Sequence, residues 1–241
     1  MRPVVVVTGD SGTLGTAIVK ELLSHDYAVI GISRRLTREI QELTSVFVDR
    51  YKHISFDLSQ PEKIEDLYHS ELKGLGPIYG LVNNAAYAYD EIVTNASIEE
   101  IERMFRVNVY SPIMLTKYVL RDMLLHDVAG SIVHVSSVSA HTGYRGLSMY
   151  AASKAAIEAF SKTVAREWGV RGIRSNCVAP GFMETHMSAS LTEEQKKRIY
   201  QRTSLRIPTS VEDVAKLIRF LLSDESKSIT GTTIHIDCGT L

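Results

Sequence analysis

Three side chains in the middle of the sequence have the types and spacing that proton transfer requires. Tyr150 and Lys154 lie four residues apart, so on a helix they share one face, ~6 Å apart along the axis. An ammonium at that distance stabilises a phenolate and lowers the pKa of the phenol from about 10. Ser137 ends an apolar run, residues 131–137, that is typical of a buried strand. The pattern predicts a hydroxyl that holds a carbonyl or alcohol, a tyrosine that exchanges its proton and a lysine that tunes the tyrosine.

The start of the chain supplies context that a tyrosine–lysine pair alone lacks, because most such pairs are solvated on helix surfaces. A β-branched run at residues 4–7 leads into a glycine turn and a helical pattern, and a second apolar run follows at 27–32. Such a turn lets backbone N–H groups and the helix N-terminus bind a phosphate, although Asp10 adds negative charge there. The predicted phosphate contacts are Gly9, Ser11, Gly12, Thr13, Leu14 and Gly15.

The end of the second predicted strand bears on cofactor choice. At this position of a dinucleotide-binding unit, an acid binds the ribose 2′-hydroxyl, whereas a nearby arginine accommodates a 2′-phosphate. Ser33 is not an acid, and Arg34 follows it. The pattern favours NADP(H), with NAD(H) as the alternative. If Arg34 and Arg35 are only solvated loop charges, this preference has no basis.

Two further predicted strands end in residues that suit the adenosine half of a cofactor. The third, residues 53–58, contains Asp57, which is placed to bind the adenine amino group or to cap the helix predicted over 61–72. The fourth, residues 78–82, runs into asparagines and small residues that permit close backbone approach. The predicted cofactor contacts at these two ends are Asp57, Leu58, Asn84, Ala85 and Ala86.

The middle of the chain predicts two long helices. A capping box at residues 97–100 opens the first, and Asn108 lies inside it. An Asn on a buried helix face needs a partner, which predicts a local kink with a bound water; an Asn that faces solvent is the alternative. The second helix, residues 150–168, is rich in alanine and suits tight packing against the sheet or against the same helix of another subunit.

The last third of the chain completes an alternating pattern. Residues 174–179 predict a sixth strand, and residues 232–236 predict a seventh. Between them, the polar helical segment 182–205, with a capping box at 192–195, predicts a substrate lid. Alternating strands and helices predict an α/β fold of one domain, residues 1–241: a doubly wound (Rossmann) seven-stranded parallel sheet with helices on both faces. Ligands of such sheets bind at the carboxyl ends of the strands.

Composition narrows the classes of function. The 241 residues are 44% hydrophobic, and 27 Lys and Arg nearly balance 28 Asp and Glu. This balance argues against nucleic-acid or membrane partners that bind a basic face. Two cysteines without a C-x-x-C pair predict neither a disulfide framework nor a metal site, and a cytoplasmic location is expected. The N-terminal apolar run is too short for a signal segment or a membrane span.

Taken together, the motifs resemble the short-chain dehydrogenase/reductase family over essentially the whole chain. The matching positions are Thr8, Gly9, Gly15, Asp57, Asn83, Asn84, Ala85, Asn108, Ser137, Tyr150, Lys154, Pro180, Gly181, Thr185, Thr230, Gly231 and Asp237. Two positions depart from the family pattern, since Thr13 replaces the middle glycine of the turn and Ala86 replaces the glycine after Ala85.

The resemblance assigns roles to these positions. Tyr150 would be the general acid in reduction and the base in oxidation, and Ser137 would hold the substrate oxygen. Lys154 would bind the nicotinamide ribose and lower the pKa of Tyr150, and Asn108 would position a water in a proton relay. The nicotinamide side of the cofactor would be contacted by Tyr150, Lys154, Pro180, Gly181, Phe182 and Thr185.

Among subgroups, the sequence most resembles the 3-oxoacyl-carrier-protein reductases. These dock an acidic acyl carrier protein through two arginines; Arg171 matches one, but Val128 occupies the other position. The expected activity is NADP(H)-dependent reduction of a carbonyl, of a 3-oxoacyl thioester or, alternatively, of a small polar ketone or sugar-like intermediate. A non-catalytic NADP sensor is the alternative of another class. The resemblance also implies a homo-oligomer, dimer or tetramer, paired through helices near 100–125 and 150–168.

Overall fold

Seven parallel strands form a single sheet in the computed structural model, which describes residues 2–185, 188 and 191–241. The strands are β1 (Val4–Thr8), β2 (Ala28–Ser33), β3 (Tyr51–Ser55), β4 (Ile78–Asn83), β5 (Ser131–Val135), β6 (Arg174–Pro180) and β7 (Thr233–Ile236). Their order is β3-β2-β1-β4-β5-β6-β7, so the winding direction reverses between β1 and β4. The predicted doubly wound sheet is confirmed, and ligands of such sheets bind beside a reversal of this kind, at the carboxyl ends of the strands.

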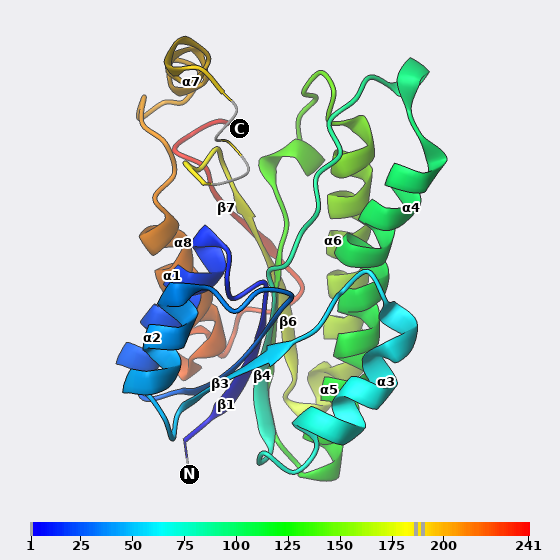
Figure 1. The fold of residues 1–241 in the computed structure, drawn as a ribbon, viewed down its shortest axis with the longest axis vertical. Helices are drawn as coiled ribbons and strands as arrows, with labels where there is room; N and C mark the ends of the chain where they lie inside the picture. Colours follow the sequence, from blue (N-terminus) through cyan, green and yellow to red (C-terminus); the bar gives the residue numbers. More distant parts are fainter. Residues whose placement is uncertain (1, 186–187, 189–190) are drawn as a thin grey trace.

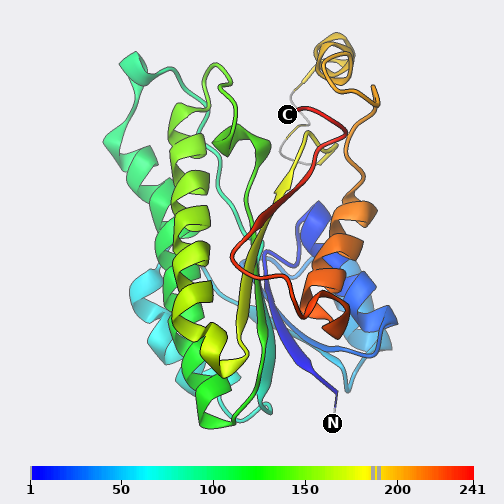
Figure 2. The same ribbon diagram turned by 180° about the vertical axis from the view of Figure 1, so that it is seen from behind.

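Helices cover both faces of the sheet (Figures 1 and 2). They are α1 (Thr13–Ser24), α2 (Arg38–Val46), α3 (Ile64–Leu67), α4 (Ile98–Phe105), α5 (Ser111–Leu125), α6 (Ser148–Trp168), α7 (Glu193–Tyr200) and α8 (Val211–Leu222). Helices α1, α2 and α8 lie on one face, and α3, α5 and α6 lie on the other. Helix α7 lies beyond the strand ends, beside the C-terminus. Among the described residues, no helix has the length and apolarity needed to cross a membrane.

The central strands are buried on both faces, which explains their uninterrupted apolar sequences. Side chains of β1 alternate between two hydrophobic clusters: Val5 and Val7 pack with α1 and α8, and Val4 and Val6 pack with α3 and α5. The two clusters fix both helical layers against the sheet, so the strand ends that carry the site have a rigid support.

Strand β3 differs from the prediction in its position along the chain. It spans Tyr51–Ser55 instead of residues 53–58, in parallel register with β2 from Val29↔Tyr51 to Ser33↔Ser55. Tyr51 is buried at its start and takes part in a polar network described below. Asp57 therefore follows the strand end by two residues. Helix α2, capped by the Thr37 side chain, was not predicted.

The first long helix loses its regular α-helical bonding where Asn108 predicts a kink. Helix α4 runs into the π turn η4 (Arg106–Tyr110) before α5 begins. Only half of the predicted capping box forms: the Ser97 hydroxyl accepts the Glu100 N–H at 3.4 Å, but the Glu100 carboxylate accepts the Tyr87 hydroxyl at 2.6 Å. Glu100 thereby ties this helix to the chain that leaves β4.

The segment predicted as a lid lies along the C-terminal residues. The capping box that opens α7 is complete, with Thr192 and Gln195 bonded in both directions. Beyond α7, the Ser204 and Leu205 N–H groups donate to the Gly239 and Cys238 carbonyls. Residues 186, 187, 189 and 190 of this segment lie outside the described residues.

Candidate active site

The glycine turn between β1 and α1 is closed by contacts that two of its glycines alone permit. A Cβ on Gly15 would lie 1.9 Å from the Gly9 carbonyl oxygen, and one on Gly9 would lie 2.9 Å from the Ala85 Cα. Gly9 also has φ +71°, in the left-handed region. Gly12 meets nothing closer than 3.4 Å. The shifted glycine spacing therefore leaves the close approach of strand and helix intact, and Thr13 is accommodated as the exposed first residue of α1.

The N-terminus of α1 has the features of a phosphate site. Gly12 caps the helix without a side-chain acceptor, and the first turn holds no acidic residue. The first N–H groups of a helix have no intrahelical partners and attract anions. Ser11, Gly12 and Thr13 line a cavity of about 550 Å³ that extends between α1, α2 and α8. Three of the turn residues predicted to bind phosphate, Ser11, Gly12 and Thr13, thus line one cavity at the helix N-terminus, where the Gly12 N–H donates to the Gly9 carbonyl at 3.0 Å.

The Asp10 side chain, in the glycine turn, is bonded to residues of β3. Its carboxylate is fully buried and turned beneath β2, where Oδ2 accepts the Tyr51 hydroxyl at 2.6 Å and is bonded to the His53 Nδ1 at 2.7 Å. Gly31 makes room for it, since a Cβ there would lie 2.0 Å from Oδ2. The carboxylate that adds negative charge at this turn is thus engaged by two side chains of β3, and Asp10 anchors the turn to that strand.

Asn84 supports the turn from the neighbouring strand. Its side-chain amide donates to the Thr8 carbonyl at 2.9 Å and the Gly9 carbonyl at 3.3 Å, while the Asn84 and Ala85 N–H groups donate to the Thr8 hydroxyl at 3.0 Å. Asn84 and Ala85 are thus next to the predicted pyrophosphate site. The Asn84 side chain is used for holding the turn.

The adenosine end is formed by the tips of β2 and β3. The Ser33 hydroxyl donates to the Ser11 hydroxyl at 2.8 Å, which links β2 to the glycine turn, and Arg34 is exposed beside it. Asp57 accepts the Ser59 N–H at 3.0 Å within the turn after β3, and the helical turn at Pro61–Lys63 has Gln60 as its N-cap with no side-chain cap bond, so Asp57 does not cap that helix. Burial opposes ionisation of Asp57, but hydrogen bonds from Ser59 and the charge of Arg34 hold its pKa below the usual value. Asp57 and Arg34 therefore face the same small region.

The reaction end is organised by Lys154. Its side chain is only 3% exposed, and its ammonium donates to the Val135 carbonyl at 2.7 Å, at the carboxyl end of β5. The Nζ atom lies 5.6 Å from the centre of the Tyr150 ring, one helical turn back. The predicted proximity of phenol and ammonium is confirmed.

Ser137 follows Val135 by two residues and accepts the Ser139 N–H at 3.1 Å as the cap of the turn η5 (Val138–Ala140).

The ionisation of this pair differs from the prediction. Burial raises the pKa of the Tyr150 phenol, and the carboxylate of Asp90 raises it further. Burial lowers the pKa of Lys154 to about 8. The expectation that Lys154 brings the pKa of Tyr150 below its usual value is therefore wrong for the polypeptide by itself, because burial of the phenol is the largest influence on its pKa.

Asn108 is buried, which removes the alternative in which it faces solvent. Its amide oxygen accepts the Tyr87 N–H at 2.8 Å, and its amide nitrogen donates to the Tyr87 carbonyl at 2.9 Å and the Ser153 hydroxyl at 3.0 Å. The side chain therefore joins the segment after β4 to helix α6, one residue before Lys154. This clamp is a contact that the sequence did not predict.

The predicted nicotinamide contacts follow β6. Gly181 donates its N–H to the Ile236 carbonyl at 3.0 Å, and a Cβ there would lie 2.8 Å from the Asp237 Cα. Phe182 packs on α7, with its ring centre 5.9 Å from that of Tyr200. Pro180 is the last residue of β6, and the Thr185 N–H donates to the Ser188 hydroxyl oxygen at 2.9 Å.

Sequence reasoning missed a polar link beside Ser137. The Glu158 carboxylate accepts the hydroxyl of Ser136 and lies 2.9 Å from the Nε2 of His141. Glu158 is one turn after Lys154 on α6, so the same spacing that pairs Tyr150 with Lys154 extends to it. A glutamate on the buried face of this helix was the signal in the sequence.

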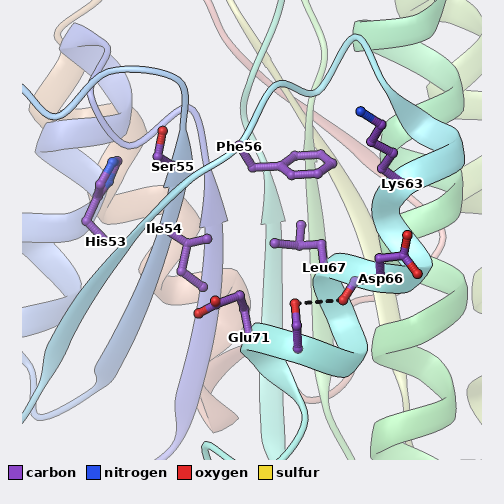
Figure 3. Close-up of a pocket in the computed structure, with 9 residues that line it drawn as sticks. His53, Ile54, Ser55, Phe56, Lys63, Asp66, Leu67 and Glu71 are labelled. Carbon is purple, nitrogen blue, oxygen red and sulfur yellow. Dashed lines mark hydrogen bonds between the residues drawn. The ribbon is translucent and has the colours of Figure 1, made fainter.

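A separate cavity of about 450 Å³ lies at the opposite edge of the sheet, between β3 and α3 (Figure 3). Ile54, Phe56 and Leu67 line it together with charged residues such as Lys63 and Glu71. None of the predicted site residues lines it. Among the described residues, no three His, Cys, Asp or Glu side chains gather as a metal site would require.

Comparisons with known proteins agree with this arrangement. Residues 9–240 match the family model described as enoyl-(acyl carrier protein) reductase. The chain is 35% identical to 3-oxoacyl-(acyl-carrier-protein) reductase FabG of Haemophilus influenzae, over 98% of this chain and 97% of that protein. It is also 35% identical to carbonyl reductase family member 4 of Xenopus tropicalis, over 99% and 98% of the two chains.

Solved structures share the fold over nearly the whole length. The structure of ElxO with NADP bound superposes with a TM-score of 0.90 at 27% identity, and covers 100% of this chain and 99% of that one. The structure of 4-hydroxyisoleucine dehydrogenase complexed with NADH superposes with a TM-score of 0.92 at 25% identity, over 99% and 98% of the two chains.

Proposed function

Because the chain belongs to the short-chain dehydrogenase/reductase family of oxidoreductases, we propose that it is an NADP(H)-dependent carbonyl reductase whose first substrate class is 3-oxoacyl thioesters. The observation that carries this proposal is the anchoring of the Lys154 ammonium on the Val135 carbonyl, which places it between Tyr150 and the strand end that bears Ser137.

Each catalytic side chain has a distinct task in this proposal. A bound nicotinamide supplies the hydride that reaches the carbonyl carbon. Ser137 donates a hydrogen bond to the substrate oxygen, and Tyr150 donates its proton to that oxygen as negative charge develops there. The Lys154 ammonium stabilises the phenolate that remains and binds the nicotinamide ribose. Asn108 keeps α6 in register with the segment after β4 and supports the relay that returns a proton to Tyr150.

The glycine turn fits the pyrophosphate of NADP(H). A side chain at Gly9 or Gly15 would fill the cradle, and the helix end above it carries no acid. Arg34 supplies a cation beside Ser33 for the 2′-phosphate, and Asp57 supplies an acceptor for the adenine amino group. Similar structures hold NADP in one case and NADH in another, so NAD(H) is the weaker alternative.

The substrate is better described as a thioester than as an acyl carrier protein. Arg171, the one arginine that matches the docking pattern, is paired with Asp127 at 3.0 Å. It also lies beyond the C-terminal end of α6, roughly 30 Å from Tyr150 at ~1.5 Å per residue. A small polar ketone is the second candidate, supported by the carboxylate of Asp90, whose charge acts on the Tyr150 phenol.

Oligomerisation and location belong to the same proposal. The outer face of α6 exposes Ala152, Ala155 and Ala159, at a spacing that lets a second helix approach closely. We propose pairing through this helix and its neighbours α4 and α5, in a dimer or tetramer, which light scattering of the purified protein would measure. Two free cysteines suit a cytoplasmic location.

NADPH oxidation by the purified protein tests the function. We expect turnover with acetoacetyl-coenzyme A above that with acetone-like and sugar-like ketones. Tyr150→Phe should lower kcat by about 1,000-fold or more, since the proton donor is lost, while the Kd for NADPH changes by less than about threefold. A protein that binds NADPH but oxidises it with no carbonyl would be a sensor. Activity retained in Tyr150→Phe would refute the assigned role of that residue.

The cofactor preference has its own test. Arg34→Asp removes the cation and adds the acid that binds a ribose 2′-hydroxyl. We expect the kcat/KM ratio of NADPH to NADH to fall by about 100-fold, or about 3 kcal/mol. Arg35→Asp, the adjacent loop arginine, is the control for general charge. Equal ratios in wild type and Arg34→Asp would mean that the 2′-phosphate is recognised elsewhere.

A further inference from the structure

Glu158 is a buried carboxylate next to the reaction centre. It lies in the middle of α6, one turn after Lys154, and is 6% exposed. Its Oε1 accepts the Ser136 hydroxyl and lies 2.9 Å from His141 Nε2, which donates to it in the Nε2–H tautomer. A carboxylate out of water is retained as a charged group only where such donors replace its hydration.

Consecutive residues at the end of β5 are attached to successive turns of α6. The Val135 carbonyl accepts from Lys154, and the next residue, Ser136, donates to Glu158. Ser137 comes next, at the start of η5, and His141 closes the far end of that turn with its own bond to Glu158. Glu158 therefore holds residues 136–141, which carry Ser137, against the helix that carries Tyr150 and Lys154.

Glu158 is also part of the electrostatic surroundings of Lys154. The ionisable groups that face the ammonium are Tyr150 and Glu158 from α6, His134 from β5 and Cys177 from β6. Burial lowers the pKa of His134 to about 3 and raises that of Cys177 to about 12, so both are neutral near pH 7. Burial lowers the pKa of Lys154, and Cys177 and then Glu158 oppose this lowering.

The outer end of this network reaches solvent. The His141 side chain is 29% exposed, and its ring meets that of His235 on β7 edge to face, with centres 4.4 Å apart. The order of groups is thus an exposed imidazole, a buried carboxylate and, one turn further into the molecule, the buried ammonium.

We infer that Glu158 and His141 are positioning residues of the reaction centre, which fix the Ser137 segment on α6 and place a negative charge beside Lys154. The inference rests on the proposed carbonyl reduction for its kinetic consequences, but not for the titration of Lys154. If Glu158 only accepted hydrogen bonds and placed no charge beside Lys154, replacing it by Gln would leave that titration unchanged.

Glu158→Gln is the central variant, because the amide oxygen keeps both acceptor bonds while the charge is lost. We expect kcat with NADPH and acetoacetyl-coenzyme A to fall about tenfold, with the KM for NADPH changed less than about threefold. The alkaline limb of the kcat profile should move to lower pH by about one unit, because an ammonium without its carboxylate loses its proton earlier. Glu167→Gln, an exposed glutamate on the same helix, is the matched control and should leave the profile in place.

A readout without turnover separates this inference from the proposed function. The pKa of Lys154 is followed by NMR in protein labelled with ¹³C-lysine, with Lys154→Met for assignment, and it should be lower in Glu158→Gln than in wild type. That shift would support the inference even if no carbonyl is reduced. An unchanged pKa of Lys154 would overturn it even in an active enzyme.

His141 provides a second variant that does not alter α6. His141→Gln can still donate a hydrogen bond to Glu158, and we expect its kcat to lie within about threefold of the wild-type value. His141→Leu cannot donate this bond, and we expect its kcat to fall about tenfold. Equal kcat values for His141→Leu and wild type would overturn the positioning role of His141, whatever the folding yield of Glu158→Gln.

Discussion

The two halves of the sheet each contain a buried carboxylate bonded to a hydroxyl and an imidazole. In the half that forms the glycine turn, Asp10 is bonded to Tyr51 and His53 of β3. In the half that forms the reaction centre, Glu158 is bonded to Ser136 and His141. The chemical groups are the same, but their surroundings differ.

Glu158 has an ammonium one turn away, whereas the Asp10 network contains atoms that find no partner. Asp10 Oδ1 and His53 Nε2 are both buried without a hydrogen bond among the described residues. Asp10 also has the Cα of Gly31 directly against it. We infer that the Asp10 network sets only the shape of the cofactor half, while the Glu158 network also sets the charge of the reaction half. Mutations in the two networks should therefore change different measurements.

Gly31→Ala should have the largest effect on stability. The new Cβ would lie 2.0 Å from Asp10 Oδ2 and 2.7 Å from the Tyr51 hydroxyl, so the network and β2 must separate. We expect the free energy of unfolding in urea to fall by about 3 kcal/mol. The double variant Gly31→Ala with Asp10→Ala should be more stable than the sum of the single changes predicts, because one removes the clash of the other. Strict additivity would mean that Asp10 does not fill this space.

Asp10→Ala alone should cost somewhat less. It leaves the Tyr51 hydroxyl and the His53 ring buried without their acceptor. We expect this to lower the free energy of unfolding by about 2 kcal/mol. Urea unfolding measures this loss, and Asp49→Ala, in the turn before β3, serves as control for removal of an acid. A loss below about 0.5 kcal/mol would show that the network contributes no net stability.

The Asp10 network should also make the free energy of unfolding depend on pH, and the pKa of Tyr51 gives the direction of that dependence. Burial and the Asp10 carboxylate raise the pKa of Tyr51, so this phenol keeps its proton in the folded state above pH 10, whereas the unfolded chain releases it near pH 10. Stability is therefore complete below about pH 10 and falls above it, by about 1.4 kcal/mol per pH unit for this residue. Tyr51→Phe should reduce the slope of unfolding free energy against pH by that amount.

Tyr68 offers a matched comparison for this measurement. Burial and its bond to Asp122 raise the pKa of Tyr68 to about 12, so Tyr68→Phe should reduce the slope only up to that pH. The same slope in Tyr51→Phe and wild type would contradict the proposed coupling of Tyr51 to Asp10.

Features of short range in the chain were predictable from the sequence. The apolar runs of residues 4–7 and 131–135 indicate buried strands by composition alone, and the alternation of strands and helices fixes a parallel sheet. Tyr150 and Lys154 meet because helical geometry is local. The interruption of the α-helix at Asn108 was predictable for the same reason, since a buried Asn conflicts with its helical neighbours.

Features that depend on register or desolvation were not predictable. Asp10 reaches Tyr51 only because β2 and β3 pair from Val29↔Tyr51, and the start of β3 was predicted two residues late. The direction of the pKa shift of Tyr150 depends on how deeply α6 packs, which spacing does not report. His141 and Glu158 are 17 residues apart and meet through the turn after β5, which no periodicity indicates.

Glu158→Gln should have the smallest effect on stability and so gives the sharpest contrast with Asp10. The amide keeps the acceptor for Ser136 and His141, and loss of the carboxylate also removes its desolvation penalty. We therefore expect the free energy of unfolding at pH 7 to change by less than about 1 kcal/mol, although kcat falls about tenfold. If Glu158→Gln lowered the free energy of unfolding as much as Asp10→Ala does, the two networks would contribute to the molecule in the same way. The distinction between a network that sets only shape and one that also sets charge would then not hold.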